Sequence, residues 1–547
     1  MSKPKYSAAL VCGLFFLPVL AFASTHYIAA NGSDSNSGTS KTAPWLHAPG
    51  MPLCTSVCGS YTPAPGDSFI FRGGDTWHFG NSAASPYTGG TWMWGTTSTA
   101  WRGTAGNVEY IGVDQTWFSG GSWTRPILTG DNPTSLSPVG SCAHAVGVLF
   151  NLPNIQYVQL DNFEFTGLCW NSGNSFYVTH YGSNYDNSEN FMMSNLYIHG
   201  WTHTSFNCSG GGACDGSVAI YSSISTRFGS TIDHVVVDGS DSDDTSFGGV
   251  YGDGYIVQYS VFRHLAGSSV PTACHQIHDN LFEYANNTSD SSEHTDVWMC
   301  YGEYGDGAHP HGSDTSPNLF YNNVFRFIGT THMGPLSAVL WLFPPSGQTD
   351  YEFNNVFHDY YGVATNYNNY CQGGCGNLAL FNNTMEQSLP NYTGCIVCNG
   401  SAPGSSISSV NNHWIGTATT PGSVFQSTTG VTESAPLYQT IGAANAQGYT
   451  SANDFAPSSS SSPTVTAAGV NETAGFCRAF ADPAAVSSCK SGTTLGCSYN
   501  STNHTVNCPK AAGVSRPAAG AWNVGAYQFG GATSSLAPPT AVIATAD

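Results

Sequence analysis

A four-residue pattern, one polar turn residue followed by mostly apolar residues, recurs through the middle of the chain. Asn323-Val324-Phe325-Arg326 is one instance. The starts are 20 residues apart at the closest (260 to 280) and 43 at the widest (280 to 323), a range in which self-similarity indicates a stacked solenoid. The starts are Asn162, Asn195, His234, Ser260, Asn280, Asn323, Asn355, Asn383 and Asn412. The pattern predicts successive coils joined by loops of unequal length.

Each repeat predicts a strand, because β-branched and aromatic residues cluster in it while Gly, Asn, Asp and Ser surround it. Helices are disfavoured, since the 547 residues include 63 Gly and 29 Pro and long stretches of period 3.6 are missing. An Asn at the same place in successive coils can adopt the left-handed conformation of a tight turn. Its amide can also hydrogen-bond the Asn above and below. We therefore expect stacked asparagines to fix the bend of each coil.

The third position of the repeat is apolar, except for Glu164, and we expect it to stack inside the coil. Its members are Tyr197, Val236, Phe262, Phe282, Phe325, Phe357, Met385 and Trp414. Because neighbouring side chains of a strand take opposite faces, the fourth position is predicted to point to water. From Ser260 onward it holds Arg263, Glu283, Arg326, His358 and Glu386. This mixed-charge ladder is interpreted either as a solvated surface or as a substrate-binding stripe.

The two ends of the chain add three further motifs. HYIAANGSD at residues 26–34 is followed by PAPGDSFIF at 63–71, and RPAAGAWNVGAY occupies 516–527. With the repeats over 155–415, these phrases resemble the right-handed parallel β-helix, or pectate-lyase-like, superfamily. The resemblance implies an all-β, right-handed parallel β-helix solenoid with capped ends and long disulfide-pinned loops. It does not identify a reaction, because that superfamily spans lyases, hydrolases, epimerases, adhesins and structural proteins.

The composition along the chain predicts four segments. Residues 1–23 are expected to be a signal peptide, since Lys3 and Lys5 precede an apolar run that ends in Ala21-Phe22-Ala23. We expect an N-terminal cap over 24–60, a parallel β-helix with cysteine-rich C-terminal coils over 61–530 and a flexible tail over 531–547. No later segment is apolar enough to span a bilayer. The predicted location is therefore secreted, either extracellular or periplasmic.

The cysteines support an oxidising compartment. Of 17 cysteines, Cys12 leaves with the signal peptide, so 17−1 gives 16 in the mature chain, an even number. We expect mostly disulfides, with four closely spaced pairs pinning loops: Cys54/Cys58, Cys208/Cys214, Cys371/Cys375 and Cys395/Cys398. The last two pairs also allow a zinc site as an alternative.

The charge balance limits the partners. A formal charge of −21 with only 13 basic residues would repel nucleic acid. Polyanionic glycans meet the same repulsion unless Ca²⁺ or a local Arg cluster compensates, whereas neutral polysaccharides do not. The 13% aromatic content can supply stacking faces for sugars. We expect an extracellular polysaccharide as partner and a monomeric chain.

The longest interval between repeats, from Asn280 to Asn323, contains the densest polar chemistry. His294 and Asp296 are two residues apart and would share one face of a strand. Imidazole titrates near neutrality and carboxylates orient it, so such residues can form an acid–base pair or bind a metal. In β-helix proteins of this kind a His-x-Asp strand lies in the presumed substrate groove, and this segment is similar. The predicted catalytic residues are His294, Asp296, Glu303 and Asp306 with Arg263 and Arg326; the predicted substrate contacts are Trp298, Tyr304, His309, His311 and His358.

Two reactions and one non-catalytic role remain open at this point. A polysaccharide lyase needs a base such as Arg263, Arg326, His294 or Tyr304 together with a charge neutraliser. A glycoside hydrolase needs two carboxylates, which the same segment also supplies. The alternative is a non-catalytic extracellular glycan-binding or matrix protein in which the ladder and disulfides provide rigidity.

A second acidic cluster follows the repeat at His234. Asp238, Asp241, Asp243 and Asp244 offer hard oxygen ligands on a turn, which suits Ca²⁺. The cluster lacks the terminal Glu of a full calcium loop, and an ordinary acidic surface turn is the other interpretation.

Overall fold

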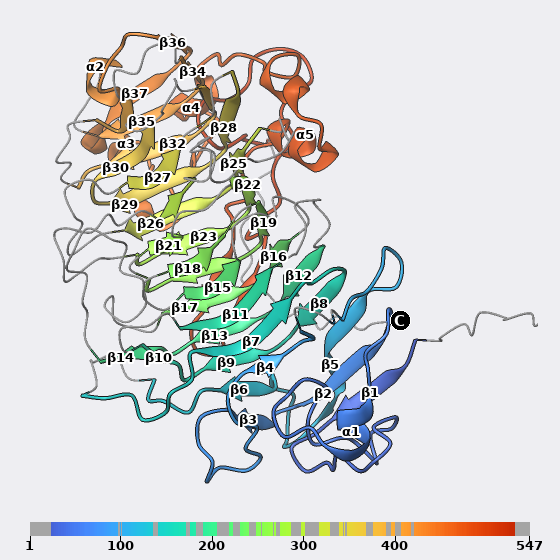
Figure 1. The fold of residues 1–547 in the computed structure, drawn as a ribbon. Helices are drawn as coiled ribbons and strands as arrows, with labels where there is room; N and C mark the ends of the chain where they lie inside the picture. Colours follow the sequence, from blue (N-terminus) through green and yellow to red (C-terminus); the bar gives the residue numbers. More distant parts are fainter. Residues whose placement is uncertain are drawn as a thin grey trace, which may run out of the picture.

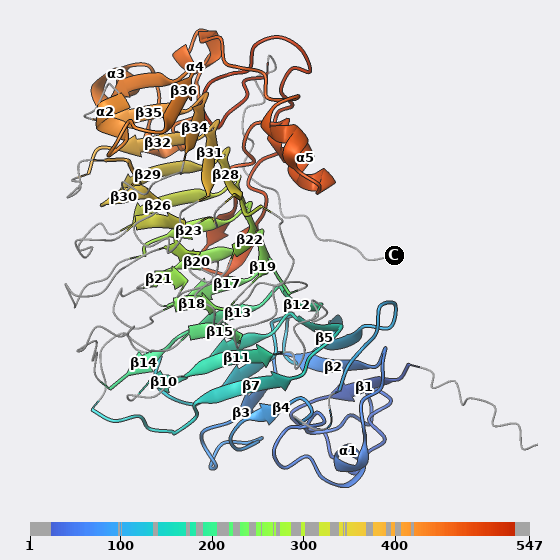
Figure 2. The ribbon, with the colours of Figure 1, turned by 45° about the horizontal axis from the view of Figure 1, so that its top comes forward.

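Strands wind round a common core in successive coils and stack into long parallel sheets (Figures 1 and 2). The computed structural model describes residues 23–96, 99, 101–134, 140–170, 175–181, 190–204, 218–222, 230–239, 248–252, 254–265, 267–269, 274–285, 297–300, 317–328, 338–342, 344, 347–367, 376–389, 395–399, 406–416 and 421–530. The strand order in every long sheet follows the chain coil by coil, and all pairs in these sheets are parallel. The chain is thus a right-handed parallel β-helix, as predicted.

Two sheets run the length of the molecule. Sheet A has 13 strands: β1 (Thr25–Ile28), β2 (Ser68–Gly73), β5 (Glu109–Phe118), β8 (Val158–Asp161), β12 (Phe191–Ser194), β16 (Thr231–Asp233), β19 (Tyr255–Gln258), β22 (Cys274–His278), β25 (Leu319–Tyr321), β28 (Thr349–Phe353), β31 (Asn377–Phe381), β34 (Ile407–Val410) and β36 (Val431–Ser434). Sheet B has 12 strands: β3 (Thr76–His78), β6 (Ile127–Thr129), β9 (Glu164–Thr166), β13 (Tyr197–His199), β17 (Val236–Asp238), β20 (Val261–Arg263), β23 (Leu281–Glu283), β26 (Val324–Ile328), β29 (Val356–Tyr360), β32 (Thr384–Gln387), β35 (His413–Gly416) and β37 (Leu437–Thr440).

The third face is made of two shorter sheets. Sheet C contains β4 (Trp92–Met93), β7 (Val148–Pro153), β11 (Phe176–Tyr181), β15 (Val218–Ser222), β18 (Gly248–Tyr251) and β21 (Gly267–Ser269). Sheet D contains β24 (Trp298–Met299), β27 (Ala338–Leu342), β30 (Val363–Tyr367) and β33 (Val397–Asn399). Strand β21 lies beside β24, so sheets C and D form one continuous face.

The remaining elements are short. Strands β10 (Cys169–Trp170) and β14 (Thr202–His203) form a parallel pair, and β38 (Ser498–Asn500) and β39 (Thr505–Asn507) an antiparallel hairpin. The helices are α1 (Ser56–Ser60), α2 (Pro421–Val424), α3 (Ile441–Ala446), α4 (Pro463–Thr466) and α5 (Pro483–Cys489), with 3-10 turns η1 (Ser451–Asn453) and η2 (Phe476–Ala479). None of the helices in the described ranges is long and apolar enough to cross a membrane.

The core fills the interior of the coils and confirms the predicted apolar stack. Phe262, Phe282, Phe325 and Phe357 lie one above another, with ring centroids 5.3, 4.8 and 4.7 Å apart. All four are fully buried. Parallel strands lie about 4.8 Å apart, so identical side chains in register stack at van der Waals distance.

Asparagines form the predicted ladder at the bend between sheets A and B. Asn323 donates its backbone N–H and its side-chain amide to Asn355 Oδ1, both at 3.0 Å. Asn355 donates in the same way to Asn383 Oδ1, at 3.0 and 3.2 Å. The Nδ2 of Asn355 also donates to the carbonyl of Phe320 at 2.8 Å. Each buried amide thereby satisfies two backbone groups of the preceding coil and donates to the asparagine side chain of the next coil.

The register differs from the predicted one in the first three repeats. Tyr197 pairs with Val236, which pairs with Val261, so the second position of later repeats matches the third position of earlier ones. The inward residues of the first three coils are therefore Phe165, Ile198 and Val237. Glu164 is an exception to the apolar pattern because it lies on the outer side. The cause is that Asn162, Asn195 and His234 are themselves left-handed, whereas from Ser260 onward the left-handed residue precedes the repeat.

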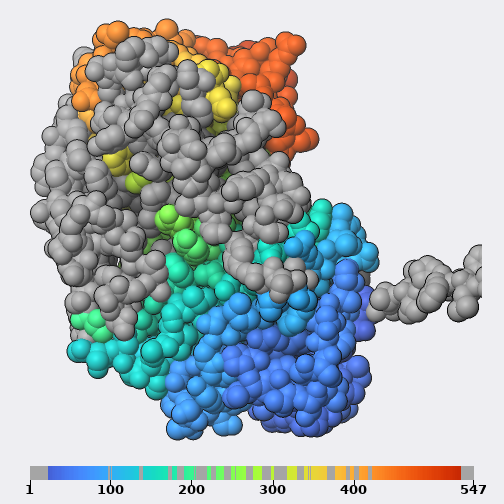
Figure 3. Space-filling view, in the orientation of Figure 1, coloured from blue at the N-terminus to red at the C-terminus, as the bar shows by residue number. Residues whose placement is uncertain are grey.

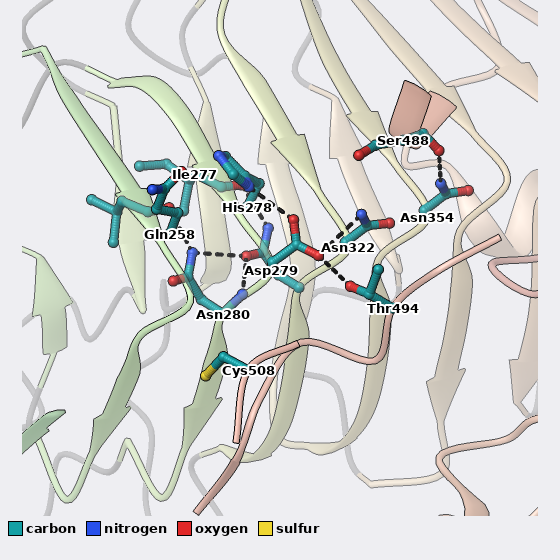
Figure 4. A network of polar contacts seen from close by, with 12 residues as sticks. Gln258, Ile277, His278, Asp279, Asn280, Asn322, Asn354, Ser488, Thr494 and Cys508 are labelled. Atoms are coloured by element: carbon teal, nitrogen blue, oxygen red, sulfur yellow. Dashed lines mark hydrogen bonds and ion pairs between the residues drawn. The ribbon is translucent and has the colours of Figure 1, made fainter. Parts of the chain in front are cut away.

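The last 90 described residues do not continue the coils. Residues 441–530, here called the C-terminal strap, run back along the bend between sheets A and B (Figures 1 and 4). Side chains of the left-handed residues hold it. Asn411 donates to the carbonyl of Val470 at 2.8 Å, and Asn354 to that of Ser488 at 3.0 Å. The prediction of cysteine-rich C-terminal coils is corrected, because this region is a returning segment that covers earlier coils.

The strap reaches as far as the coil of β13. There the ring of His504, in the β38–β39 hairpin, stacks on Tyr197 at 4.2 Å. Two disulfides, Cys477–Cys489 and Cys497–Cys508, close loops within the strap. In the space-filling view its orange and red residues form the upper right edge of the molecule (Figure 3).

Other disulfides bear on the sequence predictions. Cys54–Cys58 and Cys395–Cys398 form as expected, and Cys142–Cys169 joins cysteines 27 residues apart. The bonded state of Cys395 and Cys398 removes two of the four thiolates that the zinc alternative required. Cys208, Cys214, Cys371 and Cys375 lie outside the described residues, as do the predicted signal peptide up to residue 22 and the predicted tail from 531. At the amino end β1 already pairs with β2 in sheet A, so the coils begin within the predicted cap.

Glu109 and Glu352 are fully buried carboxyl groups paired with core residues, and Glu352, in the later coils, is the more completely enclosed. Glu352 pairs in register with Phe320 and Leu380, which are core residues, and its side chain is fully buried. Thr365 Oγ1 donates to its Oε2 at 3.1 Å. Burial raises the pKa of Glu352 to about 8. The group is therefore a neutral acid at pH 7.

Replacing a rung of the ladder tests its contribution to stability. Asn355→Ala leaves the N–H groups of Asn323 and the carbonyl of Phe320 without their partner inside the coil. We expect a loss of unfolding free energy on the order of 3 kcal/mol, measured by denaturant unfolding. Asn445→Ala, an exposed position on α3, is the matched control. Equal stability of the two variants would refute the role of the ladder.

The buried acid predicts a pH-dependent stability. An unfolded glutamate ionises near pH 4.5 but folded Glu352 only near 8, so its contribution falls by about 1.4 kcal/mol per pH unit between these values. Glu352→Gln cannot ionise and should raise the Tm relative to the unmodified protein at pH 8 far more than at pH 5. A Tm shift of the same size at both pH values would mean that Glu352 is not a buried neutral acid.

Candidate functional site

The outer side of sheets C and D is the face on which the predicted catalytic segment joins the fold. Along each strand the side chains alternate between core and exterior. Phe150, Val178, Ile220 and Val250 pair in register and belong to the core. The next residue of each strand forms an outer row, which contains Asn151, Thr179, Tyr221 and Tyr251 in sheet C and Met299 and Trp341 in sheet D.

Aromatic rings of sheet C stack along this row. The ring of Phe176 lies 4.5 Å from that of Tyr221 with an interplanar angle of 29°, and Tyr221 lies 5.0 Å from Tyr251 at 17°. All three side chains are half-buried. Asn151 and Thr179 lie on the same side, but Asn151 Oδ1 and Thr179 Oγ1 are buried. The partly exposed surface of this row in sheet C is therefore mainly aromatic, which suits the apolar faces of sugar rings.

The predicted catalytic segment flanks strand β24 of this face. His294, Asp296, Glu303, Tyr304, Asp306, His309 and His311 lie outside the described residues, so their predicted roles stay predictions. Asp296 is two residues before Trp298, the first residue of β24. The segment therefore enters and leaves the fold at sheet D.

Trp298 itself points away from the outer row. Its side chain is fully buried in the core, edge-on to Phe262 at 5.9 Å and Phe282 at 5.8 Å. This placement contradicts the expectation that Trp298 contacts a substrate. The two residues of strand β24 face opposite sides. Trp298 faces the core, and Met299 faces outward.

The mixed-charge ladder is present but covered. Arg263 lies between Asp238 at 3.3 Å and Glu283 at 3.2 Å, and Arg326 contacts Glu283 at 2.9 Å. Arg263, Glu283, His358 and Glu386 are at most 8% exposed. The expectation that these positions face water is wrong. The physical reason is the C-terminal strap, whose Tyr499 ring lies 4.6 Å from the Arg263 guanidinium.

His358 joins the ladder to the strap. Its Nδ1 lies 2.8 Å from Asp359 and its Nε2 3.2 Å from Asp454 of the strap. Asp454 also contacts Arg326 at 3.4 Å and pairs with Lys510. Burial alone would lower the pKa of His358, but the two carboxylates raise it above its ordinary value. Burial likewise disfavours the Asp454 anion, yet His358 and Lys510 hold the pKa of that carboxyl well below its usual range.

The placement of Arg263, Arg326 and His358 serves the docking of the strap. Both arginines are paired with carboxylates, and His358 has no exposed surface. No sequence signal identified the partner, because Asp454 lies 96 residues after His358.

Of the four aspartates in the predicted calcium site, the structure describes one. Asp238 is 5% exposed and lies 2.9 Å from the imidazole of His264 as well as beside Arg263. Asp241, Asp243 and Asp244 lie outside the described residues. Among the residues that are described, no group of three or more His, Cys, Asp or Glu is arranged to hold a metal ion. Calcium binding therefore stays a prediction.

No protein-family model and no curated protein sequence matches the chain. Solved structures with a similar fold include the pectate lyase Pel9A, with 12% identity over 93% of this chain and 96% of that one and a TM-score of 0.41. A GH136 lacto-N-biosidase from Eubacterium ramulus has 12% identity over 76% of this chain and 67% of that one, with a TM-score of 0.39. A rhamnogalacturonan lyase has 14% identity over 76% and 87%, with a TM-score of 0.34. At these values the likeness concerns the winding of the chain and carries no argument about activity.

The raised pKa of His358 predicts how the docking of the strap depends on pH. Because its folded pKa is raised, the stabilisation is complete below the unfolded value near 6.5 and is lost as pH rises through the folded pKa. Amide hydrogen exchange corrected for intrinsic rates should show residues 451–455 losing protection above neutral pH. His358→Gln should be less protected at pH 6 and lack that loss. His144→Gln, in the N-terminal coils, is the control. An unchanged pH profile in His358→Gln would contradict the assignment.

Proposed function

We propose that the chain is a carbohydrate-active enzyme that binds a polysaccharide along the outer row of sheets C and D. The observation that carries the proposal is the attachment of the His- and Asp-rich segment 291–316 to strand β24, within the same face as the stacked rings of Phe176, Tyr221 and Tyr251. A binding row and a set of acid–base groups on one face are the two parts that glycan cleavage needs.

The charge distribution favours a neutral polysaccharide. The chain carries −21 formal charges, and its two central arginines, Arg263 and Arg326, are paired with carboxylates beneath the strap. Among the described residues of the outer row there is no Lys or Arg to compensate a uronate polymer. Removal of a proton beside a uronate carboxylate is then not the expected chemistry, because a neutral sugar has no such carboxylate.

Hydrolysis is the reaction that the segment supports best. Residues 286–316 contain no Lys or Arg but several carboxylates, among them Asp296, Glu303 and Asp306. In hydrolysis one carboxylic acid protonates the glycosidic oxygen, and a carboxylate either attacks the sugar or activates a water. We assign these two roles to Asp296 and one of Glu303 and Asp306, with His294 positioning the acid–base groups. Disulfides among the described cysteines support the proposal that the protein acts after secretion.

Substitution with analysis of the products tests this function. The protein should release reducing ends from a neutral polysaccharide in a panel that includes xylan, β-glucan and mannan. Asp296→Ala should lower kcat by at least about 100-fold, since it removes an acid or nucleophile. The double variant Tyr221→Ala/Tyr251→Ala should instead raise KM for soluble oligosaccharides. His144→Ala is the control.

Three outcomes would count against this proposal. Unsaturated uronate absorbance would indicate elimination. Undiminished cleavage by Asp296→Ala would exclude the segment. Binding of a glycan with no cleavage would favour the alternative, a non-catalytic glycan-binding or matrix protein.

A further inference from the structure

Strand β5 extends beyond the coil to which it belongs. It has 10 residues, whereas its neighbours β2 and β8 have 6 and 4, and β8 pairs only with residues 109–111. Residues 114–118 and the following turn project from the side of the N-terminal coils (Figures 1 and 2). The interior does not require this extension, because the core side chains of β5 precede it.

The projection carries aromatic side chains. Phe118 is 37% exposed, and Trp117 and Trp123 are half-buried. The Trp117 ring meets that of Tyr27 edge to face at 5.4 Å. Trp117 and Phe118 are adjacent in the strand and face opposite sides, so Trp117 lies with Tyr27, and Phe118 lies on the side of Gly73 and Trp123. These four residues, Tyr27, Trp117, Phe118 and Trp123, on the two sides of the projecting strand, are here called the β5 platform.

The platform is held in place by the backbone beneath it. Gly73 of β2 pairs with Phe118, and a Cβ on Gly73 would lie 3.0 Å from Trp123 Cδ1 and 2.6 Å from the carbonyl of Thr124. The glycine thereby lets the indole lie against the strand. Ser119 donates its backbone N–H to the carbonyl of Gly73 at 2.8 Å, which fixes the start of the turn. The rings are therefore positioned, not merely exposed.

The surroundings of the platform are nearly neutral. Residues 115–124 contain no Asp, Glu, Lys or Arg. Two ion pairs flank the platform, Lys41 with Asp114 at 2.5 Å and Arg72 with Asp75 at 2.8 Å, and each of them balances one positive and one negative charge. Hydroxyl and amide groups of Gln115, Thr116 and Ser122 lie in the same exposed stretch. Aromatic rings with neutral hydrogen-bonding groups match the apolar ring faces and hydroxyls of an uncharged sugar.

The size of the platform excludes a stable protein partner. With Phe118 the most exposed ring, four aromatic side chains offer roughly 300 Å² at most. A standard protein–protein interface needs about 800 Å² from each partner. A few sugar units need no more than the platform offers.

We propose that the β5 platform is an accessory binding site for a neutral polysaccharide, separate from the outer row of sheets C and D. It rests on the proposed function in taking the same class of polymer. Its role is to hold the protein on an insoluble polymer while the other face acts on a chain.

Sedimentation with insoluble polysaccharides tests the platform. The probes are insoluble xylan, microcrystalline cellulose and chitin, with Trp117→Ala/Phe118→Ala as the platform variant. We expect the unmodified protein to sediment with at least one probe and the variant to bind it at least about ten-fold more weakly. Val470→Ala, an equally exposed apolar position at 37%, is the matched control and should bind normally.

Measuring both variants by sedimentation and by polysaccharide cleavage distinguishes the platform from the outer row of sheets C and D. Tyr221→Ala/Tyr251→Ala should still sediment, and the platform variant should not. If the platform variant sediments normally, or if no probe binds the unmodified protein, the accessory site is overturned whatever the outcome for sheets C and D. Concentration-dependent self-association that the platform variant abolishes would also overturn it, since the occupant would then be a second copy of the chain.

Discussion

The fold depends on satisfying the buried backbone at each bend of the coil. A chain that turns inward from sheet A to sheet B exposes peptide groups to an apolar interior, where an unpaired group costs about 1–3 kcal/mol. The stacked asparagines from Asn280 to Asn412 supply both a donor and an acceptor at this place in successive coils. Because each amide serves the coil above and the coil below, the ladder also fixes the register, and with it the stack of phenylalanines.

The same bend explains why the strap lies where it does. The left-handed residue before each ladder Asn turns its own side chain outward, and Asn354, Asn382 and Asn411 donate to strap carbonyls. The ladder asparagines therefore bind backbone groups inside the coil, whereas the left-handed residues before them bind the strap on the surface. The charged ladder beside them would be an odd feature on an open solenoid. Beneath the strap it becomes a buried network in which Glu283 and Asp454 each serve more than one cation.

The sequence predicted the features that repeat from coil to coil, but not the contacts between residues far apart along the chain. The Asn repeats indicated the coils, the bend and the interior phenylalanines, because these features depend on residues one coil apart. The burial of Arg263 and His358 could not be predicted, since their cover comes from residues far along the chain; Tyr197 and His504 are 307 residues apart. The inward orientation of Trp298 could not be predicted, because a strand of two residues is too short to show an alternation of apolar and polar positions. The outer row had no signal either, as β11, β15 and β18 lack the Asn repeat that marked sheet B.

The covered ladder changes where chemistry can take place. A three-sided β-helix offers few extended faces, and here the bend between sheets A and B is occupied along much of its length by the chain's own strap. A polymer that lies along the molecule must use a face that the strap leaves open, and sheets C and D lie away from that bend. Their outer row is less charged than the ladder, and under the proposed function this difference would select the ligand. The tyrosines and Phe176 of the row offer no compensation for a polyanion, whereas their rings would match the apolar faces of a neutral sugar. The position of the strap and the proposed preference for an uncharged polymer thus rest on one arrangement of the chain.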